Sequence, residues 1–157
     1  DTVVVVVADH GEEFGEHGYW GHTSNFTPAQ VRVPFLLSGP GIEAGSDHRP
    51  TSHLDVSNTL LELLGADPAQ RRGYSLGEDL LTPSTERDRA MGSWAHMGLW
   101  TESGIFSLPL EPERDFLAVM TPDWRLHPDR EARFEAEAEP LQALSEECLR
   151  FLAPVAR

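Results

Sequence analysis

The sequence predicts an α/β fold, in which buried strands of parallel type come first and a small antiparallel sheet and a C-terminal helix follow. Three observations lead to this prediction: a valine-rich run near the start, an amphipathic helical pattern near the middle, and short strand-like runs in the second half. The chain of 157 residues is long enough for one ordinary globular domain. We assign residues 1–85 to the α/β core with the functional site, and residues 86–157 to the antiparallel sheet and closing helix of the same domain.

The first predicted strand is the apolar run at residues 3–8, which contains five consecutive valines. A continuous β-branched run without polar alternation is typical of a strand covered on both faces inside a parallel sheet. Such a strand needs neighbours on both sides, so we expect further sequence upstream. Residues 27–30 predict a helical turn. A second buried strand is predicted at residues 31–38, with pairing that begins after Pro34 because proline cannot donate to a ladder.

The middle of the chain predicts a helix over residues 52–65. Its apolar residues fall at 56, 60, 61, 63 and 64, which places them on one stripe of a helix. Asp55 is the predicted N-cap and Gly65 the predicted stop.

The second half predicts an antiparallel sheet from strand-like runs at residues 90–97, 104–110, 116–120 and 124–127. A helix over residues 130–152, interrupted at Pro140, is predicted to close the fold. Its buried side would consist of Leu141, Leu144, Cys148, Leu149, Phe151 and Leu152.

The composition excludes some partners. A formal net charge of −14 argues against nucleic-acid binding, because the phosphate backbone would be repelled. The single cysteine, Cys148, can form no internal disulfide, and its place on an apolar helical stripe indicates a buried thiol. The sequence contains no apolar segment of transmembrane length.

Candidate metal ligands directly follow the first predicted strand. Asp9, His10 and Gly11 lie where open α/β sheets place their ligand sites, at the carboxyl end of a strand. A carboxylate and an imidazole suit zinc, manganese or magnesium, and Gly11 would let the backbone bend around the ion. The alternative is that Asp9 caps a turn and His10 is an ordinary loop residue.

The following glycine-rich loop, residues 12–25, supplies a further candidate in His22. If the loop folds back, His22 could bind a second ion or hold a sulfate or phosphate oxygen. Glu12 either contacts the metal ligands without binding the metal itself or is exposed to solvent. His53 could orient a ligand or be satisfied by the backbone. We expect Glu13 and Glu16 to be solvated, His17 to lie on the surface, and Trp20 and Phe26 to pack the loop rather than bind substrate.

Three segments together resemble a known family. They are residues 9–16 with Gly21 and His22, residues 31–36 with Pro40 and Gly41, and residues 52–61. Their order and spacing are similar to the sulfatase-like branch of the alkaline phosphatase superfamily, over residues 1 to about 80. Within that branch, residues 20–26 look most like the inner-membrane PbgA/YejM proteins.

The resemblance implies that the chain is the C-terminal part of an alkaline-phosphatase-like sandwich. It implies that Asp9 and His10 bind a divalent metal ion (Mg, Mn, Ca or Zn), and that His22 lies where related phosphoethanolamine transferases hold the transferred phosphate. The nucleophile and the first acidic ligand of such enzymes lie upstream, so no residue here is assigned to them. Thr23 and Ser24 are too near His22 in sequence to serve as the nucleophile.

Two functions are compatible with this resemblance. The first is a metal-dependent hydrolase or phosphoryl/phosphoethanolamine transferase acting on sulfate or phosphate esters, lipid-linked ones included. There a metal-activated hydroxyl would attack the sulfur or phosphorus, with His22 donating to a non-bridging oxygen or the leaving group. The alternative is a catalytically inactive PbgA/YejM-like module that binds lipopolysaccharide or phospholipid and regulates envelope lipid synthesis.

Both functions carry the same expected location, the bacterial inner membrane, reached through a missing N-terminal segment, with this domain in the periplasm. A third reading is a structural α/β domain in which the Asp9-His10-Gly11 sequence is accidental; it predicts no bound metal.

Overall fold

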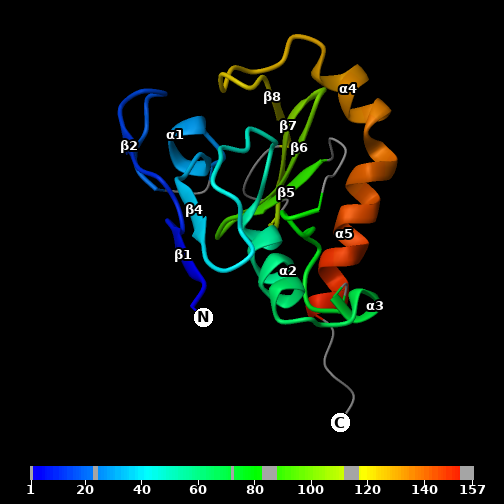
Figure 1. The fold of residues 1–157 in the computed structure, drawn as a ribbon. Coiled ribbons are helices and arrows are strands. Elements are labelled where there is room, and N and C mark those ends of the chain that lie inside the picture. The colour runs from blue at the N-terminus through cyan, green and yellow to red at the C-terminus, as the bar shows by residue number, and fades with distance from the viewer. Residues whose placement is uncertain (1, 23–24, 72, 83–87, 112–116, 153–157) are drawn as a thin grey trace. The chain divides into compact units, whose positions relative to one another are not determined.

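A computed structural model describes residues 2–22, 25–71, 73–82, 88–111 and 117–152 (Figure 1). It confirms a mixed α/β chain with small antiparallel sheets and a C-terminal helix. The chain divides into two compact units. The first contains residues 1–23 and 27–87, and the second contains residues 24–26 and 88–157. Each unit is described by itself below.

The valine-rich run forms strand β1 (Val4–Val7), which pairs with β4 (Phe35–Ser38). The pairing starts after Pro34, as predicted, but it is antiparallel. The predicted parallel arrangement is therefore absent from the described residues. Val4 and Val6 are about half exposed, at 51% and 52%, because a two-stranded ribbon cannot cover both faces of its own strands.

The predicted helical turn is α1 (Pro28–Val31), and the predicted middle helix is α2 (His53–Leu63). Asp55 is not the N-cap. Ser52 caps α2 by accepting from the backbone N–H of Leu54, while the Asp55 carboxylate, three residues on, accepts from the N–H of Ser52 at 2.7 Å. This is a capping box. The helix ends before Gly65, whose φ of +73° suits glycine, as predicted.

A strap of residues 75–80 forms hydrogen bonds with the polar groups on one side of α2. The Ser75 hydroxyl donates to the carbonyl of Leu54 at 2.7 Å, and the N–H of Glu78 donates to the fully buried Asp55 carboxylate at 2.8 Å. The strap follows the short helix α3 (Pro68–Arg71). Asp55 therefore holds both the start of α2 and the strap, which explains the acid at this position better than an N-cap would.

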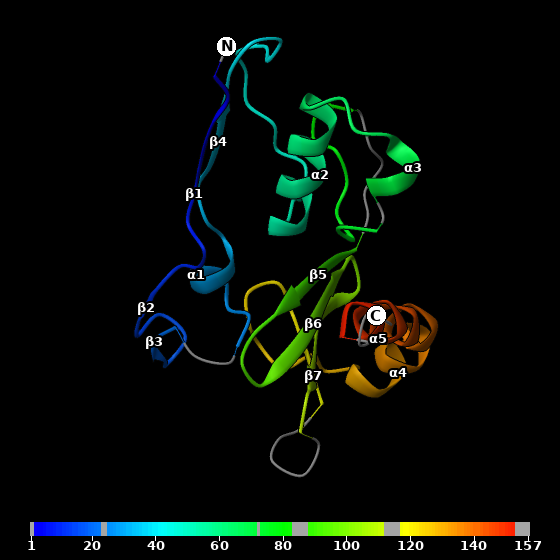
Figure 2. The same ribbon diagram turned by 90° about the horizontal axis from the view of Figure 1, so that it is seen from below.

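The second unit contains the predicted antiparallel sheet. Its strands β5 (Arg89–Gly92), β6 (His96–Thr101), β7 (Gly104–Pro109) and β8 (Ala118–Met120) pair in chain order. All four are labelled in Figure 1, and the first three in Figure 2. The run at 90–97 is two strands rather than one, because Ser93 turns the chain by donating its N–H to His96 at 2.9 Å. Residues 124–127 contribute only an isolated bridge between Met120 and Leu126. The predicted strand start at 116 lies outside the described residues.

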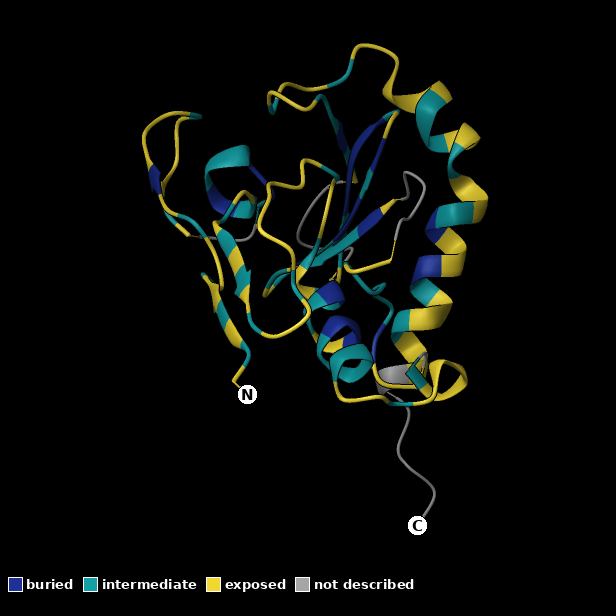
Figure 3. Ribbon diagram, viewed as in Figure 1, coloured by how far each residue is buried: buried dark blue, intermediate teal, exposed yellow. Residues whose placement is uncertain are grey.

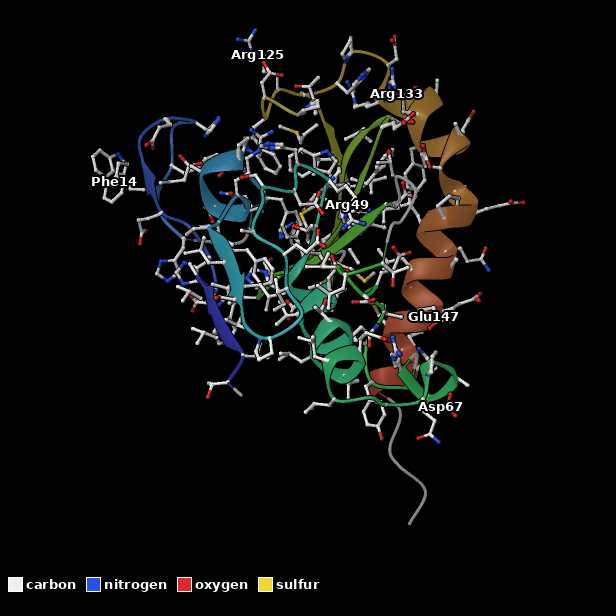
Figure 4. All side chains as sticks on the ribbon, in the orientation of Figure 1. Phe14, Arg49, Asp67, Arg125, Arg133 and Glu147 are labelled. Carbon is white, nitrogen blue, oxygen red and sulfur yellow. The ribbon has the colours of Figure 1, made fainter. Side chains whose placement is uncertain are left out.

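The closing helix is interrupted, as predicted, and consists of α4 (Arg130–Ala136) and α5 (Ala138–Leu152). The break is at Glu137, and Pro140 lies in the first turn of α5, where its missing N–H costs nothing. Arg133 of α4 (Figure 4) donates to the carbonyl of Ser103 at 2.9 Å, and the Ser103 hydroxyl donates to Glu137 at 2.6 Å. The break is therefore held against the turn between β6 and β7.

The predicted buried side of the closing helix is only partly correct. Leu141 and Leu144 are buried, Cys148 is half-buried, and Leu149 is exposed. Burial, followed by the nearby Glu147 carboxylate, raises the pKa of the Cys148 thiol, so this cysteine is a poor nucleophile. The side chains of Phe151 and Leu152 lie outside the described residues.

Figure 3 marks buried residues in both units, but all the buried apolar residues among those described belong to the second unit. They are Phe26, Leu99, Ile105, Phe106, Val119, Leu141 and Leu144. The first unit instead buries polar groups such as Glu13, Asp55 and Thr59, which are tied by hydrogen bonds. None of the helices described is long and apolar enough to cross a bilayer.

Candidate metal and ester-binding site

The loop after β1 folds into a short hairpin that places two histidines together. Strand β2 (Glu13–Phe14) pairs with β3 (Trp20–Gly21), so that Glu13 faces Gly21. The turn residues Gly15 and Gly18 have φ values of +103° and +85°, which other residues rarely adopt. As a result the ring of His22 stacks on that of His10, with centroids 4.0 Å apart and an interplanar angle of 23°.

Asp9 and His10 present two ligand groups side by side. The Nδ1 of His10 lies 2.9 Å from the carbonyl oxygen of Gly11. Because a carbonyl can only accept, Nδ1 carries the hydrogen and Nε2 keeps its lone pair. That Nε2 lies 3.7 Å from Asp9 Oδ2. Hydrogen bonds from the backbone N–H groups of His10 and of Asp9 itself, and the nearby His10 ring, lower the pKa of the Asp9 carboxyl.

These two groups fit two positions of a divalent metal site. An ionised carboxylate and an imidazole nitrogen with a free lone pair are ordinary ligands of zinc and manganese, and the carboxylate also suits magnesium or calcium. The Asp9 side chain is 89% exposed, so it is open to an ion. Within the described ranges, however, no three His, Cys, Asp or Glu side chains are grouped so that they could hold a metal. Asp9 and His10 are therefore at most part of a ligand set.

His22 has a partner that the sequence left undecided. Its Nδ1 lies 3.2 Å from Oε2 of Glu12 and 3.4 Å from Oε1. Glu12 is therefore not merely solvated. The imidazole Nε2 is the nitrogen that remains for a ligand, and more than half of the His22 side chain is exposed.

Glu13 and His17 were predicted wrongly as solvated and surface residues. Glu13 is fully buried, and its Oε1 lies 2.9 Å from Nδ1 of the half-buried His17. Burial alone would raise the pKa of Glu13, but hydrogen bonds from Thr27 and from the His17 side chain and backbone outweigh it, so the pKa is lowered. The carboxylate ties the hairpin to the residue before α1. No pattern in the sequence separates Glu13 from its neighbours Glu12 and Glu16.

Three further predictions, for Trp20, His53 and Phe26, are decided by the structure. Trp20 is 74% exposed, and its contact within the loop is with Phe14, edge to face, with centroids 6.4 Å apart. Phe14 points outward from β2 (Figure 4).

His53 is satisfied by the backbone, because its Nε2 donates to the carbonyl of Ala8 at 2.7 Å. Phe26 is buried in the second unit. Thr23 and Ser24 lie outside the described residues.

Gly11 is required by close packing against α1. Its N–H donates to the carbonyl of Gln30 at 2.7 Å, which brings the chain against α1. A Cβ at this position would overlap the carbonyl oxygen of Ala29. Hence the glycine fixes where the two preceding residues, Asp9 and His10, stand relative to α1.

We expect Gly11→Ala to lower the free energy of unfolding of the intact protein by about 2 kcal/mol, because the backbone of α1 must move to admit a methyl group. Urea unfolding followed by circular dichroism measures this loss. Gly45→Ala is the matched control, since a Cβ there meets no atom within 4 Å. Equal stability of the two variants would contradict the packing role of Gly11.

Comparison with known proteins places this geometry in a family context. The family model described as "Sulfatase" matches residues 1–66, the segment that contains β1, the hairpin and α2. The chain is 31% identical over 146 residues to a choline-sulfatase of Rhizobium meliloti, which covers 90% of the chain and 26% of that protein. It is 36% identical over 87 residues to a Delta 4,5-hexuronate-2-O-sulfatase of Bacteroides thetaiotaomicron, covering 51% of the chain and 18% of that protein.

An arylsulfatase of Chlamydomonas reinhardtii is 26% identical over 140 residues, covering 78% of the chain and 22% of that protein. The chain thus spans about a quarter or less of the length of these curated relatives. Together the matches support a place in the sulfatase and alkaline-phosphatase-like superfamily.

Proposed function

We propose that this chain supplies part of the active site of a sulfatase-like hydrolase that cleaves sulfate esters. The observation that carries the proposal is the grouping of Asp9, His10 and His22 at the end of β1, inside the segment that matches the sulfatase family. The relatives named above are sulfatases by their descriptions, which favours a sulfate ester over a phosphate ester as substrate. The nucleophile is not assigned to any residue of this chain.

The residues divide into two roles. Asp9, through its carboxylate, and His10, through Nε2, would hold a divalent cation. When bound, such a cation lowers the pKa of the attacking hydroxyl and neutralises charge on the ester oxygens. Because Nδ1 of His22 is bound to Glu12, its Nε2 is the nitrogen left to contact a non-bridging sulfate oxygen or the leaving oxygen.

A second proposal rests on residues 20–22, which begin the segment that resembles PbgA/YejM proteins. In it the protein is a module of the bacterial inner membrane, facing the periplasm, that binds the phosphate groups of lipopolysaccharide or phospholipid without turnover. Phosphoryl or phosphoethanolamine transfer at the same residues lies between the two proposals, because it would combine binding of a phosphate group with turnover. The substrate test below separates these proposals.

We expect His22→Ala to lower the turnover of a chromogenic aryl sulfate by the intact protein about 100-fold, because one charge-stabilising contact to the reacting group is lost. Steady-state kinetics and elemental analysis are measured on the same preparation. The metal content should stay unchanged, and His48→Ala, an exposed histidine of the same unit, should affect neither quantity.

Two outcomes would overturn this assignment. Parallel loss of metal and turnover in His22→Ala would place His22 among the metal ligands. A metal-loaded wild-type protein that hydrolyses no sulfate ester, but binds lipid phosphate, would favour the second proposal.

A further inference from the structure

We propose that Glu12 is a positioning residue that fixes the orientation and tautomer of His22. This inference rests on the proposed function of His22. The contact that carries it is the approach of His22 Nδ1 to both oxygens of the Glu12 carboxylate, at 3.2 and 3.4 Å. A carboxylate can only accept, so Nδ1 carries the hydrogen. Nε2 is then the nitrogen left to accept from or bind a substrate group.

The hairpin brings the two side chains together. Glu13 lies opposite Gly21 in the β2–β3 pair, so Glu12 and His22, one residue further out on each strand, face each other across the hairpin. Gly21 has a φ of +89°, and a Cβ on it would lie 3.5 Å from Oε1 of Glu12. A Cβ there would be in ordinary contact with the carboxylate, so glycine is favoured at this position by its positive φ.

The ring of His22 is held on two sides. Glu12 binds one edge of the imidazole, and the ring of His10 stacks on one face at a centroid distance of 4.0 Å. Together these contacts restrict both the flip and the tilt of the ring. An imidazole that has to meet one oxygen of a substrate benefits from this restriction, because less orientational freedom is lost in the reaction.

The other acids of the hairpin have different partners. Glu13 is bound to His17, and Glu16 Oε2 accepts from the backbone N–H of Phe14 at 2.6 Å. Neither contact involves His22. Glu12 and His22 are also largely exposed, and exposed pairs of this kind contribute little to stability. The removal of Glu12 should therefore change the state of His22 without unfolding the hairpin.

The decisive experiment is long-range proton–nitrogen NMR of the intact protein with ¹⁵N-labelled histidine, at an alkaline pH where imidazoles are neutral. We expect the wild-type His22 signal, identified by its loss in His22→Gln, to show the Nδ1–H tautomer. Glu12→Ala should shift it to the Nε2–H form that free imidazoles favour. Glu12→Gln, whose amide oxygen still accepts, should keep Nδ1–H. Glu43→Ala, an exposed acid of the same unit, should change nothing.

A wild-type Nε2–H signal, or a signal unchanged in Glu12→Ala, would overturn the proposal. The second arm is kinetic: Glu12→Ala should lower the turnover of the aryl sulfate about tenfold, with substantial recovery in Glu12→Gln. The two arms separate the two proposals. If the tautomer responds as expected but the wild-type protein has no sulfatase activity, the positioning role stands and the proposed function fails.

Discussion

Replacement of Glu13 by alanine is expected to lower the free energy of unfolding by about 3 kcal/mol, because a buried charge is removed from partners that remain buried. Glu13 is fully buried, and its carboxylate binds the His17 side chain, the His17 backbone and Thr27. Loss of the carboxylate therefore leaves donors on the hairpin and before α1 without their acceptor. Urea unfolding of the intact protein at neutral pH measures the effect.

The same carboxylate predicts how stability varies with pH. The pKa of Glu13 is lowered in the folded protein, because the hydrogen bonds from Thr27 and His17 outweigh the opposing effect of burial. A group whose folded pKa is depressed stabilises the fold above its unfolded pKa, about 4.3 for glutamate. This stability is lost as the pH falls through the folded pKa. Wild-type protein should thus lose stability below about pH 4.3, and Glu13→Gln should lose less of it.

Glu16→Ala is the control for both measurements. Glu16 lies in the same hairpin but is exposed, so its removal should change the free energy of unfolding by no more than about 0.5 kcal/mol. If Glu13→Ala were as stable as Glu16→Ala, the buried carboxylate would not hold the hairpin to α1.

Local patterns predicted the elements that depend on neighbouring residues. The apolar stripe and Gly65 located α2, and the position of Pro34 located the start of β4. Ser52 and Asp55 form a capping box whose spacing is visible in the sequence, and this spacing is the signal that favours Ser52 over Asp55 as the N-cap. The Pro and Gly breaks located the antiparallel sheet.

Features that depend on distant partners could not be predicted in this way. Five valines indicated a buried parallel strand, but pairing direction and burial are set by which strands lie alongside, and β1 has only β4 as a neighbour among the described residues. Likewise, no pattern in the sequence distinguishes the three glutamates of the hairpin, Glu12, Glu13 and Glu16. Their different burial follows from the register of β2 with β3 and from the place of Thr27.

The site itself was predicted as residue types, and the structure adds their arrangement. Asp9 and His10 are adjacent in sequence, so their proximity was certain; the stacking of His22 on His10 was not. It depends on the hairpin reversing the chain through Gly15 and Gly18.

Asp9→Ala and His10→Ala are each expected to abolish stoichiometric metal binding by the intact protein. Asp9 supplies an ionised carboxylate whose pKa is lowered by backbone N–H groups, and His10 supplies Nε2 because Nδ1 is bound to Gly11. Removal of either side chain leaves only one of these two ligand groups at the end of β1. One group is too few to keep the ion bound together with the other ligands of the site. Elemental analysis after dialysis measures the metal per chain.

Graded variants test whether the loss arises from ligation rather than from misfolding. Asp9→Asn keeps an oxygen but not the charge, so it should weaken metal binding less than Asp9→Ala does. His48→Ala, an exposed histidine outside the hairpin, should bind metal as the wild type does. Asp9 is itself exposed, so its removal should leave the metal-free protein as stable as before. Undiminished metal content in both Asp9→Ala and His10→Ala would exclude these residues as ligands, whereas loss of metal with unchanged stability is expected only of residues that bind the ion.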